Sequence, residues 1–104
     1  MSEIDDKIKE RIYAFAQELE KSIRIKELYL FGSYAKGTNN QFSDIDLAVV
    51  SEDFSGVRCV DHDKFIDALM NSDRAIEPIA FSVESFTDDD LFVKEIKSHS
   101  IRLI

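Results

Sequence analysis

The chain has 104 residues, of which 44% are hydrophobic and 11% aromatic, and its formal net charge is −8 with a pI near 4.6. A chain of this length holds one domain with one hydrophobic core, so we expect a single domain over residues 1–104. The acidic balance repels nucleic-acid phosphates at long range. It argues against direct binding of DNA or RNA, but not against a small nucleotide that arrives with divalent cations.

The cysteine content and the hydropathy of the chain exclude several other classes. Cys59 is the single cysteine, so no disulfide can form within the chain, and we expect a small packed side chain there. Residues 1–6 lack the basic region and apolar run of a signal peptide. No stretch approaches the roughly 18 apolar residues of a membrane span. We therefore expect a soluble, cytoplasmic protein without membrane contact.

The first predicted element is an amphipathic helix near the N-terminus. Ser2 followed by Asp5 resembles a capping box, the pattern that begins a helix. Behind it, apolar residues recur at steps of three and four, which is the spacing of one helix face. The charges on the other face are of both signs, so a membrane-surface helix is the weaker interpretation. The apolar positions are Ile4, Ile8, Ile12, Phe15, Leu19 and Ile23.

Three apolar runs predict β-strands at residues 28–31, 45–50 and 75–81. Each run has the length of a strand and is rich in aliphatic or aromatic residues. Proline lacks the N–H group that a strand ladder uses. Pro78 therefore places the third strand at an edge of the sheet or beside a local irregularity.

Helical patterns lie between and after these strands. Thr87 with Asp90 is a second possible capping box, and residues 101–104 can form a last short strand. Helices that alternate with strands in this way predict an α/β domain whose helices pack on the sheet, with the strand order left open. The helical stripe between the second and third strands consists of Phe65, Ile66, Leu69 and Met70.

The segment between the first two strands begins with a candidate anion site. Gly32 ends the first strand and permits a tight turn with close backbone approach, and Ser33 begins a short helical turn. N–H groups at the start of a helical turn can bind an anion. Ser33 can cap that turn or donate its hydroxyl group to a phosphate, and Lys36 can reach the same anion one turn later. The glycine spacing is not that of a Walker A loop.

The same segment ends in two carboxylates at the start of the second strand. Residues i and i+2 of a strand point to the same side, so Asp44 and Asp46 project together, with Cα atoms about 6.6 Å apart. Ile45, Leu47 and Val49 then face the core. Adjacent carboxylates repel each other, and Mg²⁺ relieves this repulsion while binding substrate phosphates. Two metal ions roughly 3.5–4 Å apart can stabilise an in-line phosphoryl displacement.

Each half of this segment is weak when taken alone. An Asp-x-Asp sequence is common, and a pair of solvated carboxylates in a turn is its usual explanation. Here a Gly-Ser pair closes one predicted strand, ten residues intervene, and Asp-x-Asp opens the next. We interpret the combination as one site.

This combination resembles the signature of the polymerase-β-like nucleotidyltransferases, and within them the minimal nucleotidyltransferase (MNT) domains. The order of the predicted elements agrees along nearly the whole chain. The family adds a third carboxylate on a later strand, for which Glu77 is the candidate. Many members have Asp there, so Glu77 is a departure, and an exposed acid on an edge strand is the alternative. The matching segments are Gly32-Ser33-Tyr34-Ala35-Lys36-Gly37 and Ser43-Asp44-Ile45-Asp46-Leu47.

The resemblance implies an α/β (α+β) fold of the polymerase-β type, with helices packed on a small mixed sheet. It implies transfer of a nucleoside monophosphate, most simply AMP from ATP, to an acceptor hydroxyl group, with release of pyrophosphate. The expected nucleotide-binding residues are Gly32, Ser33 and Lys36. The expected catalytic residues, which also bind two Mg²⁺ ions, are Asp44, Asp46 and Glu77.

The resemblance also implies a partner protein. MNT domains are often encoded beside HEPN-domain proteins as toxin–antitoxin pairs, and some add AMP to a tyrosine of the HEPN toxin. This chain would then be an antitoxin whose acceptor is its partner. The alternative is a non-catalytic antitoxin that neutralises the partner by contact. The intact Gly32-Ser33 pair and the two aspartates favour the enzyme, whereas Glu77 leaves room for the alternative.

Four other features suggest a function but have a simpler structural interpretation. Tyr34 could contact a base, although a partly buried aromatic is the preferred interpretation. His62 and Asp63 could be metal ligands, but near a helix start they are more often solvated. Phe42 is expected to anchor the loop before Ser43. The acidic run at residues 88–90 is better explained by helix capping and the helix dipole than by a metal.

Overall fold

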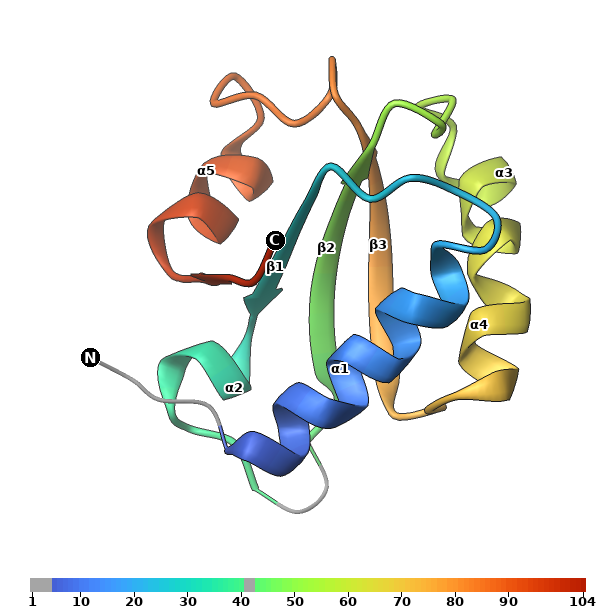
Figure 1. Ribbon diagram of the computed structural model, residues 1–104. Coiled ribbons are helices and arrows are strands. Elements are labelled where there is room, and N and C mark those ends of the chain that lie inside the picture. Colours follow the sequence, from blue (N-terminus) through green and yellow to red (C-terminus); the bar gives the residue numbers. More distant parts are fainter. Residues whose placement is uncertain (1–4, 41–42) are drawn as a thin grey trace.

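The computed structural model describes residues 5–40 and 43–104, without the side chains at positions 58 and 59. The predictions for Ser2, Ile4 and Phe42, and the packing of Cys59, therefore lie outside the described residues. The elements in chain order are α1 (Asp6–Leu19), β1 (Glu27–Phe31), α2 (Ser33–Lys36), β2 (Ile45–Ser51), α3 (Arg58–His62), the 3₁₀ turn η1 (Asp63–Phe65), α4 (Ile66–Asn71), β3 (Ile76–Ser82), α5 (Leu91–Ser98) and β4 (Ile101–Arg102) (Figure 1). In the described part of the chain, none of the helices is both long and apolar enough to cross a membrane.

The four strands form one mixed sheet in the order β3-β2-β1-β4. β1 pairs antiparallel with β2 and with β4, whereas β2 and β3 are parallel. β3 is an edge strand, which confirms the position predicted from Pro78. The Ile45 N–H group donates to the Ala75 carbonyl oxygen (2.9 Å), and alternate residues of a parallel strand bond to the same neighbour. Pro78 therefore faces the open edge, where its missing N–H group costs no ladder bond.

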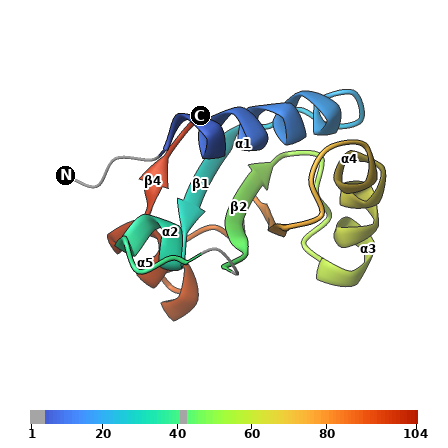
Figure 2. The same ribbon diagram turned by 90° about the horizontal axis from the view of Figure 1, so that it is seen from below.

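Helices cover both faces of this sheet, as the view from below shows (Figure 2). α1 and α4 lie on one face, and the main hydrophobic core lies between them and the strands. Ile45, Leu47 and Val49 contribute to this core and are fully buried, which confirms the predicted inner face of β2. The other members from α1 and β1 are Ile8, Ile12, Phe15, Ala16, Leu19, Leu28 and Leu30.

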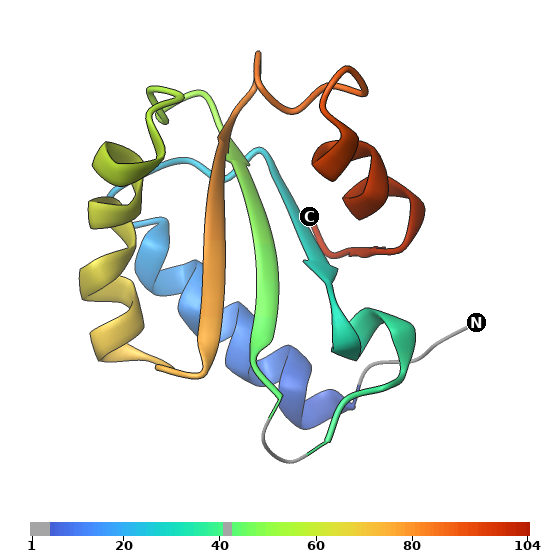
Figure 3. The same cartoon turned by 180° about the vertical axis from the view of Figure 1, so that it is seen from behind.

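α5 packs on the opposite face and builds a second, smaller core. Val93 and Ile96 of α5 contact this core, together with residues of all three long strands. Seen from behind (Figure 3), α5 lies beside the upper half of the strands, whereas α2 and the starts of β2 and β3 lie at the lower end. The strand residues are Tyr29, Ala48, Val50 and Phe81, joined by Phe86.

The helix starts differ from the predicted capping boxes. The N-cap of α1 is Asp5, whose Oδ1 accepts the Lys7 N–H group (2.8 Å). The N-cap of α5 is Asp90 rather than Thr87, and its Oδ1 accepts the Phe92 N–H group (2.8 Å). In both cases an aspartate directly before the helix binds the exposed N–H groups of the first turn, which a short acidic side chain does well.

The apolar helix face predicted between β2 and β3 is partly wrong, because some of its residues point to solvent instead of the core. Phe65 is fully buried, but Ile66 is 44% exposed and Met70 is 64% exposed, while Ala68 is buried. The reason is that two short helices, joined by a 3₁₀ turn, replace one regular helix. The turn ends at Phe65 and changes the direction in which the following residues point.

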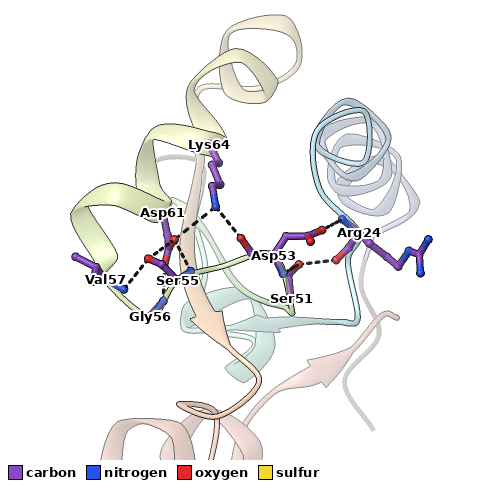
Figure 4. A network of polar contacts seen from close by, with 8 residues as sticks. All are labelled: Arg24, Ser51, Asp53, Ser55, Gly56, Val57, Asp61 and Lys64. Atoms are coloured by element: carbon purple, nitrogen blue, oxygen red, sulfur yellow. Dashed lines mark hydrogen bonds and ion pairs between the residues drawn. The ribbon is translucent and has the colours of Figure 1, made fainter.

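A network of polar contacts stabilises the loop between β2 and α3 (Figure 4). Its centre is Asp61, which is fully buried. The Asp61 carboxylate accepts the N–H and hydroxyl groups of Ser55 (2.8 and 2.9 Å) and the N–H group of Gly56 (2.9 Å). Lys64 lies 3.8 Å away and also donates to the Asp53 carbonyl oxygen (2.7 Å). The network therefore attaches the loop to α3 through one buried charge.

We expect Asp61→Asn to destabilise the fold in a pH-dependent way. Burial raises the pKa of the Asp61 carboxyl group, but the hydrogen bonds from Ser55 and Gly56 and the charge of Lys64 lower it by more. A lowered folded-state pKa stabilises the protein above the unfolded value of about 3.9, and this contribution disappears as the pH falls. Urea unfolding should show a loss of about 1–3 kcal/mol at pH 7. The loss should shrink below about pH 4; a loss equal at both pH values would contradict the charge-based explanation.

Candidate active site

The strand register brings the three predicted carboxylates together. Phe31 is the partner of Asp46 in the β1–β2 pair, and Glu77 is the partner of Asp46 in the β2–β3 pair. Residues directly opposite each other on neighbouring strands share one face of the sheet. Asp44 precedes β2 and lies two residues before Asp46, so it is on the same side. Phe31, Asp46 and Glu77 thus form a row across the sheet, on the face that carries α5.

Two of these carboxyl groups, those of Asp46 and Glu77, have raised pKa values. Burial raises the pKa of Asp46, and the charge of Asp44 raises it further. The charge of Asp44 is the main cause of the raised pKa of Glu77, followed by loss of water contact, a hydrogen bond to Asp44 and the charge of Asp46. Two carboxyl groups share a hydrogen bond only when one is protonated. The group therefore has an excess of negative charge that a cation would relieve.

Gly32 lies directly against Asp46. Its φ of +74° is in the region that favours glycine. A Cβ atom at this position would lie 2.2 Å from Asp46 Oδ2 and 3.1 Å from Asp46 Cγ. The residue is therefore glycine for two reasons, the backbone conformation and the space that the carboxylate occupies. The sequence indicated the first reason but not the second.

The turn after Gly32 is the single helical turn α2. Its first intrahelical bond joins the Lys36 N–H group to the Gly32 carbonyl oxygen (3.1 Å), and Gly37 ends it in the left-handed conformation. Ser33 is its first residue, as predicted, and lies next to the glycine that contacts Asp46. The anion site and the carboxylates predicted from the sequence are therefore adjacent in space.

Lys36 is turned toward α5. Its Nζ lies 3.9 Å from Glu95 Oε1, and its side chain is about half exposed. An exposed pair at this distance contributes little, roughly 0–1 kcal/mol. Lys36 can therefore exchange Glu95 for a phosphate at small cost. The sequence did not indicate Glu95, because it lies on a different helix.

Apolar side chains lie beside the carboxylates, and sequence reasoning did not identify them. Phe31 of the row packs edge-to-face against Phe92 of α5, with ring centroids 5.9 Å apart. Ile79 follows Glu77 by two positions and packs against the smaller core. Apolar neighbours lower the local dielectric constant, which explains why burial raises the pKa of Asp46.

The other suggested residues have structural roles. Tyr34 is partly buried and packs against the main core, so the structural interpretation is confirmed. His62 and Asp63 are exposed, and the His62 ring contacts the Phe65 ring. In the acidic run, Asp90 caps α5 and Asp88 pairs with Lys97 (3.0 Å).

The donor set at the carboxylate row fits a hard divalent cation. Within residues 5–40 and 43–104, no three Asp, Glu, His or Cys side chains are arranged as a complete metal site. Mg²⁺ does not require such a site, because it usually takes one or two carboxylates and completes its shell with water and substrate phosphates. Asp44 and Asp46 can supply oxygen ligands of this kind, and the repulsion between their charges favours a cation.

A separate groove lies at the other end of the sheet. It has a volume of about 740 Å³ and is formed by residues 20–26 together with Glu52 and Asp53. Its lining mixes acids and bases, and it contains none of the predicted site residues. It is the alternative location for a ligand.

Comparison with known proteins identifies the family. A sequence model of the family described as a nucleotidyltransferase domain matches residues 9–103. The chain belongs to this nucleotidyltransferase family. The matched range contains every candidate residue from Gly32 to Glu77, and the resemblance seen in the sequence is confirmed.

One relative of this nucleotidyltransferase domain shares a shorter segment. MJ1215 of Methanocaldococcus jannaschii, a proposed protein adenylyltransferase, is 40% identical over 42 residues. The aligned segment covers 40% of this chain and 49% of MJ1215. The match therefore spans about half the length of that relative.

Three solved structures share the fold of this nucleotidyltransferase domain. A toxin–antitoxin crystallised with AMP-PNP has a TM-score of 0.57 at 24% identity, covering 88% of this chain and 71% of that chain. The toxin–antitoxin MntA-HpeT, in a mutant form, has a TM-score of 0.52 at 21% identity, and the match covers 92% of this chain and 71% of that chain. A proposed nucleotidyltransferase from Sulfolobus solfataricus has a TM-score of 0.53 at 19% identity, and the match covers 98% of this chain and 89% of that chain. At these identities the structures establish the fold alone, and they confirm the predicted α+β class with a small mixed sheet.

Proposed function

We propose that this nucleotidyltransferase domain transfers AMP from ATP to a hydroxyl group of a partner protein, and that it acts as the antitoxin of a toxin–antitoxin pair. The observation that carries the proposal is the register that sets Asp46 beside Glu77 while Gly32 contacts Asp46. This arrangement joins a glycine at the start of a helical turn to a group of carboxylates. Few reactions besides phosphoryl or nucleotidyl transfer need both at one point.

The proposed roles are those that the family resemblance implies, and the positions of these residues support them. Gly32 and Ser33 hold the terminal phosphates of ATP, and Lys36 supplies a cation nearby. Asp44, Asp46 and Glu77 would hold Mg²⁺, which when bound would supply positive charge beside the phosphates. The acceptor hydroxyl loses its proton to solvent, its oxygen forms a bond to the α-phosphorus, the bond from the α-phosphorus to the bridging oxygen of the β-phosphate breaks, and pyrophosphate leaves.

The choice of nucleotide and acceptor is supported by the relatives. MJ1215 is named as a proposed protein adenylyltransferase, and one structural neighbour was crystallised with an ATP analogue as a toxin–antitoxin. We propose a HEPN-type toxin as the partner and one of its tyrosines as the acceptor. The chain's net charge of −8 favours a partner with a basic surface.

The proposal is tested with ATP labelled at the α-phosphate, Mg²⁺ and the protein encoded by the neighbouring gene. We expect label to appear on the partner's tyrosine and to require Mg²⁺, and we expect unlabelled ATP present during the reaction to reduce labelling more than GTP does. Label on lipid, nucleic acid or a small molecule instead would contradict a protein acceptor. If the Asp44→Asn/Asp46→Asn variant neutralises the toxin without label, the protein acts by contact.

A further inference from the structure

The start of β3 is attached to α1 by an ion pair outside the carboxylate row. Arg11 of α1 donates through Nε to Oδ2 of Asp73, a residue 62 positions away in the sequence. The Asp73 side chain is only 17% exposed, and that of Arg11 is 41% exposed. The Asp73 carboxylate is thus mostly shielded from water, whereas both side chains of the Lys26–Glu52 and Lys36–Glu95 pairs are about half exposed or more.

A continuous set of hydrogen bonds leads from this pair to the row. The other Asp73 oxygen, Oδ1, accepts the Ala75 N–H group (2.9 Å). The Ala75 carbonyl oxygen in turn accepts the Ile45 N–H group (2.9 Å). Ile45 lies between Asp44 and Asp46, and Ala75 lies two residues before Glu77. The Arg11–Asp73 pair is therefore connected to the backbone that carries all three carboxylates.

The same arginine also lies near the glycine turn. The hydrogen bond to Asp73 raises the pKa of Arg11, against the effect of burial, and the nearby Tyr34 raises it further. Tyr34 follows Ser33 in α2. The hydrogen bond from Arg11 correspondingly lowers the pKa of Asp73, so both partners stay charged.

We propose that Arg11 and Asp73 are positioning residues, which fix the start of β3 against β2 and thereby set the distance of Glu77 from Asp44 and Asp46. They do not contact the substrate themselves. This inference rests on the proposed function, because the spacing of the carboxylates matters for transfer. A misplacement of about 1 Å at reacting groups can cost roughly 100-fold in rate.

The test compares Arg11→Met with Lys21→Met. Lys21 follows α1 and pairs with Glu18 of its last turn (2.8 Å, exposed), so Lys21→Met removes an ion pair of α1 that involves no residue of β2 or β3. We expect Arg11→Met to lower kcat by about 10- to 100-fold, with the KM for ATP nearly unchanged and the protein folded. Arg11→Lys should restore part of kcat, and Lys21→Met should keep wild-type kcat.

A second measurement does not depend on activity. In the metal-free protein, the backbone amide signals of Ile45, Ala75 and Glu77 should shift in NMR spectra of Arg11→Met and of Asp73→Asn, but not of Lys21→Met. Unchanged amide signals at these positions, or an unchanged kcat in folded Arg11→Met, would overturn the inference. A wild-type protein that transfers no label overturns the proposed function, while the amide signals still test the positions of the carboxylates.

Discussion

Asp46→Asn is expected to reduce nucleotidyl transfer by at least about 10²- to 10³-fold, the scale seen when one electrostatic group of an active site is removed. Asp46 is the central member of the row, with Glu77 as its register partner and Gly32 against its carboxylate. Asparagine keeps the shape of the side chain but removes the charge that a divalent cation needs. Steady-state transfer of α-labelled AMP gives the ratio of kcat/KM values directly. Asp89→Asn, which removes an exposed acid before α5, is the matched control and should keep full activity.

The same variant should not lose stability, which separates its effect from unfolding. The pKa of Asp46 is raised by burial and by Asp44, so the folded protein binds this proton more tightly than the unfolded chain does. The ionised carboxylate therefore disfavours folding at neutral pH, and this cost disappears as the pH falls below the raised pKa. Metal-free Asp46→Asn should melt at or above the wild-type temperature at pH 7. Added Mg²⁺ and ATP should stabilise the wild type and not the variant; a clear drop in Tm for Asp46→Asn would contradict the assignment.

Gly32→Ala is the second change with a large expected effect. The new methyl group would lie 2.2 Å from Asp46 Oδ2, so Asp46 or the turn must move. The backbone adds strain, since φ +74° with ψ −151° lies in a region almost confined to glycine, which costs any other residue roughly 1–3 kcal/mol. We expect transfer to fall more than about 100-fold and urea unfolding to show a loss of about 1–3 kcal/mol.

Gly37→Ala separates the two causes of the loss expected for Gly32→Ala, the clash with Asp46 and the backbone strain. Gly37 has nearly the same φ (+75°), but a Cβ atom there would have no other atom within 4 Å. Its ψ of +16° makes it left-handed helical, a conformation that costs an alanine roughly 1–2 kcal/mol. Gly37→Ala should therefore lose a comparable or smaller amount of stability from backbone strain alone and retain most of the activity. Equal activities of the two alanine variants would show that the Gly32–Asp46 contact is irrelevant to the reaction.

The strands could be predicted because their information is local. The predicted runs at 28–31, 45–50 and 75–81 correspond to β1, β2 and β3 with shifts of one residue at their ends. The chemistry of proline limited the strand of Pro78 to an edge or to a place with a local irregularity, and the strand order shows that it is an edge strand. The predicted apolar face of β2 was confirmed because alternation in a strand needs no knowledge of the partner.

Features that depend on long-range pairing could not be predicted. Glu77 is the register partner of Asp46 because β2 and β3 are parallel neighbours. The residues of the two strands do not by themselves indicate this pairing. The contact of Gly32 with Asp46, the Phe31–Phe92 pair and the Arg11–Asp73 pair likewise join distant segments. The phase error at Ile66 and Met70 has a different cause, since a 3₁₀ turn interrupts the helical period there.

The most direct test of the site is a crystal structure of this nucleotidyltransferase domain with a non-hydrolysable ATP analogue and Mn²⁺, whose anomalous signal locates the metal. The predicted result is an anomalous peak bound by the carboxylates of Asp44 and Asp46, with the terminal phosphates on Gly32 and Ser33. The contradictory result is nucleotide in the groove formed by residues 20–26, Glu52 and Asp53, with no metal at Asp44 and Asp46.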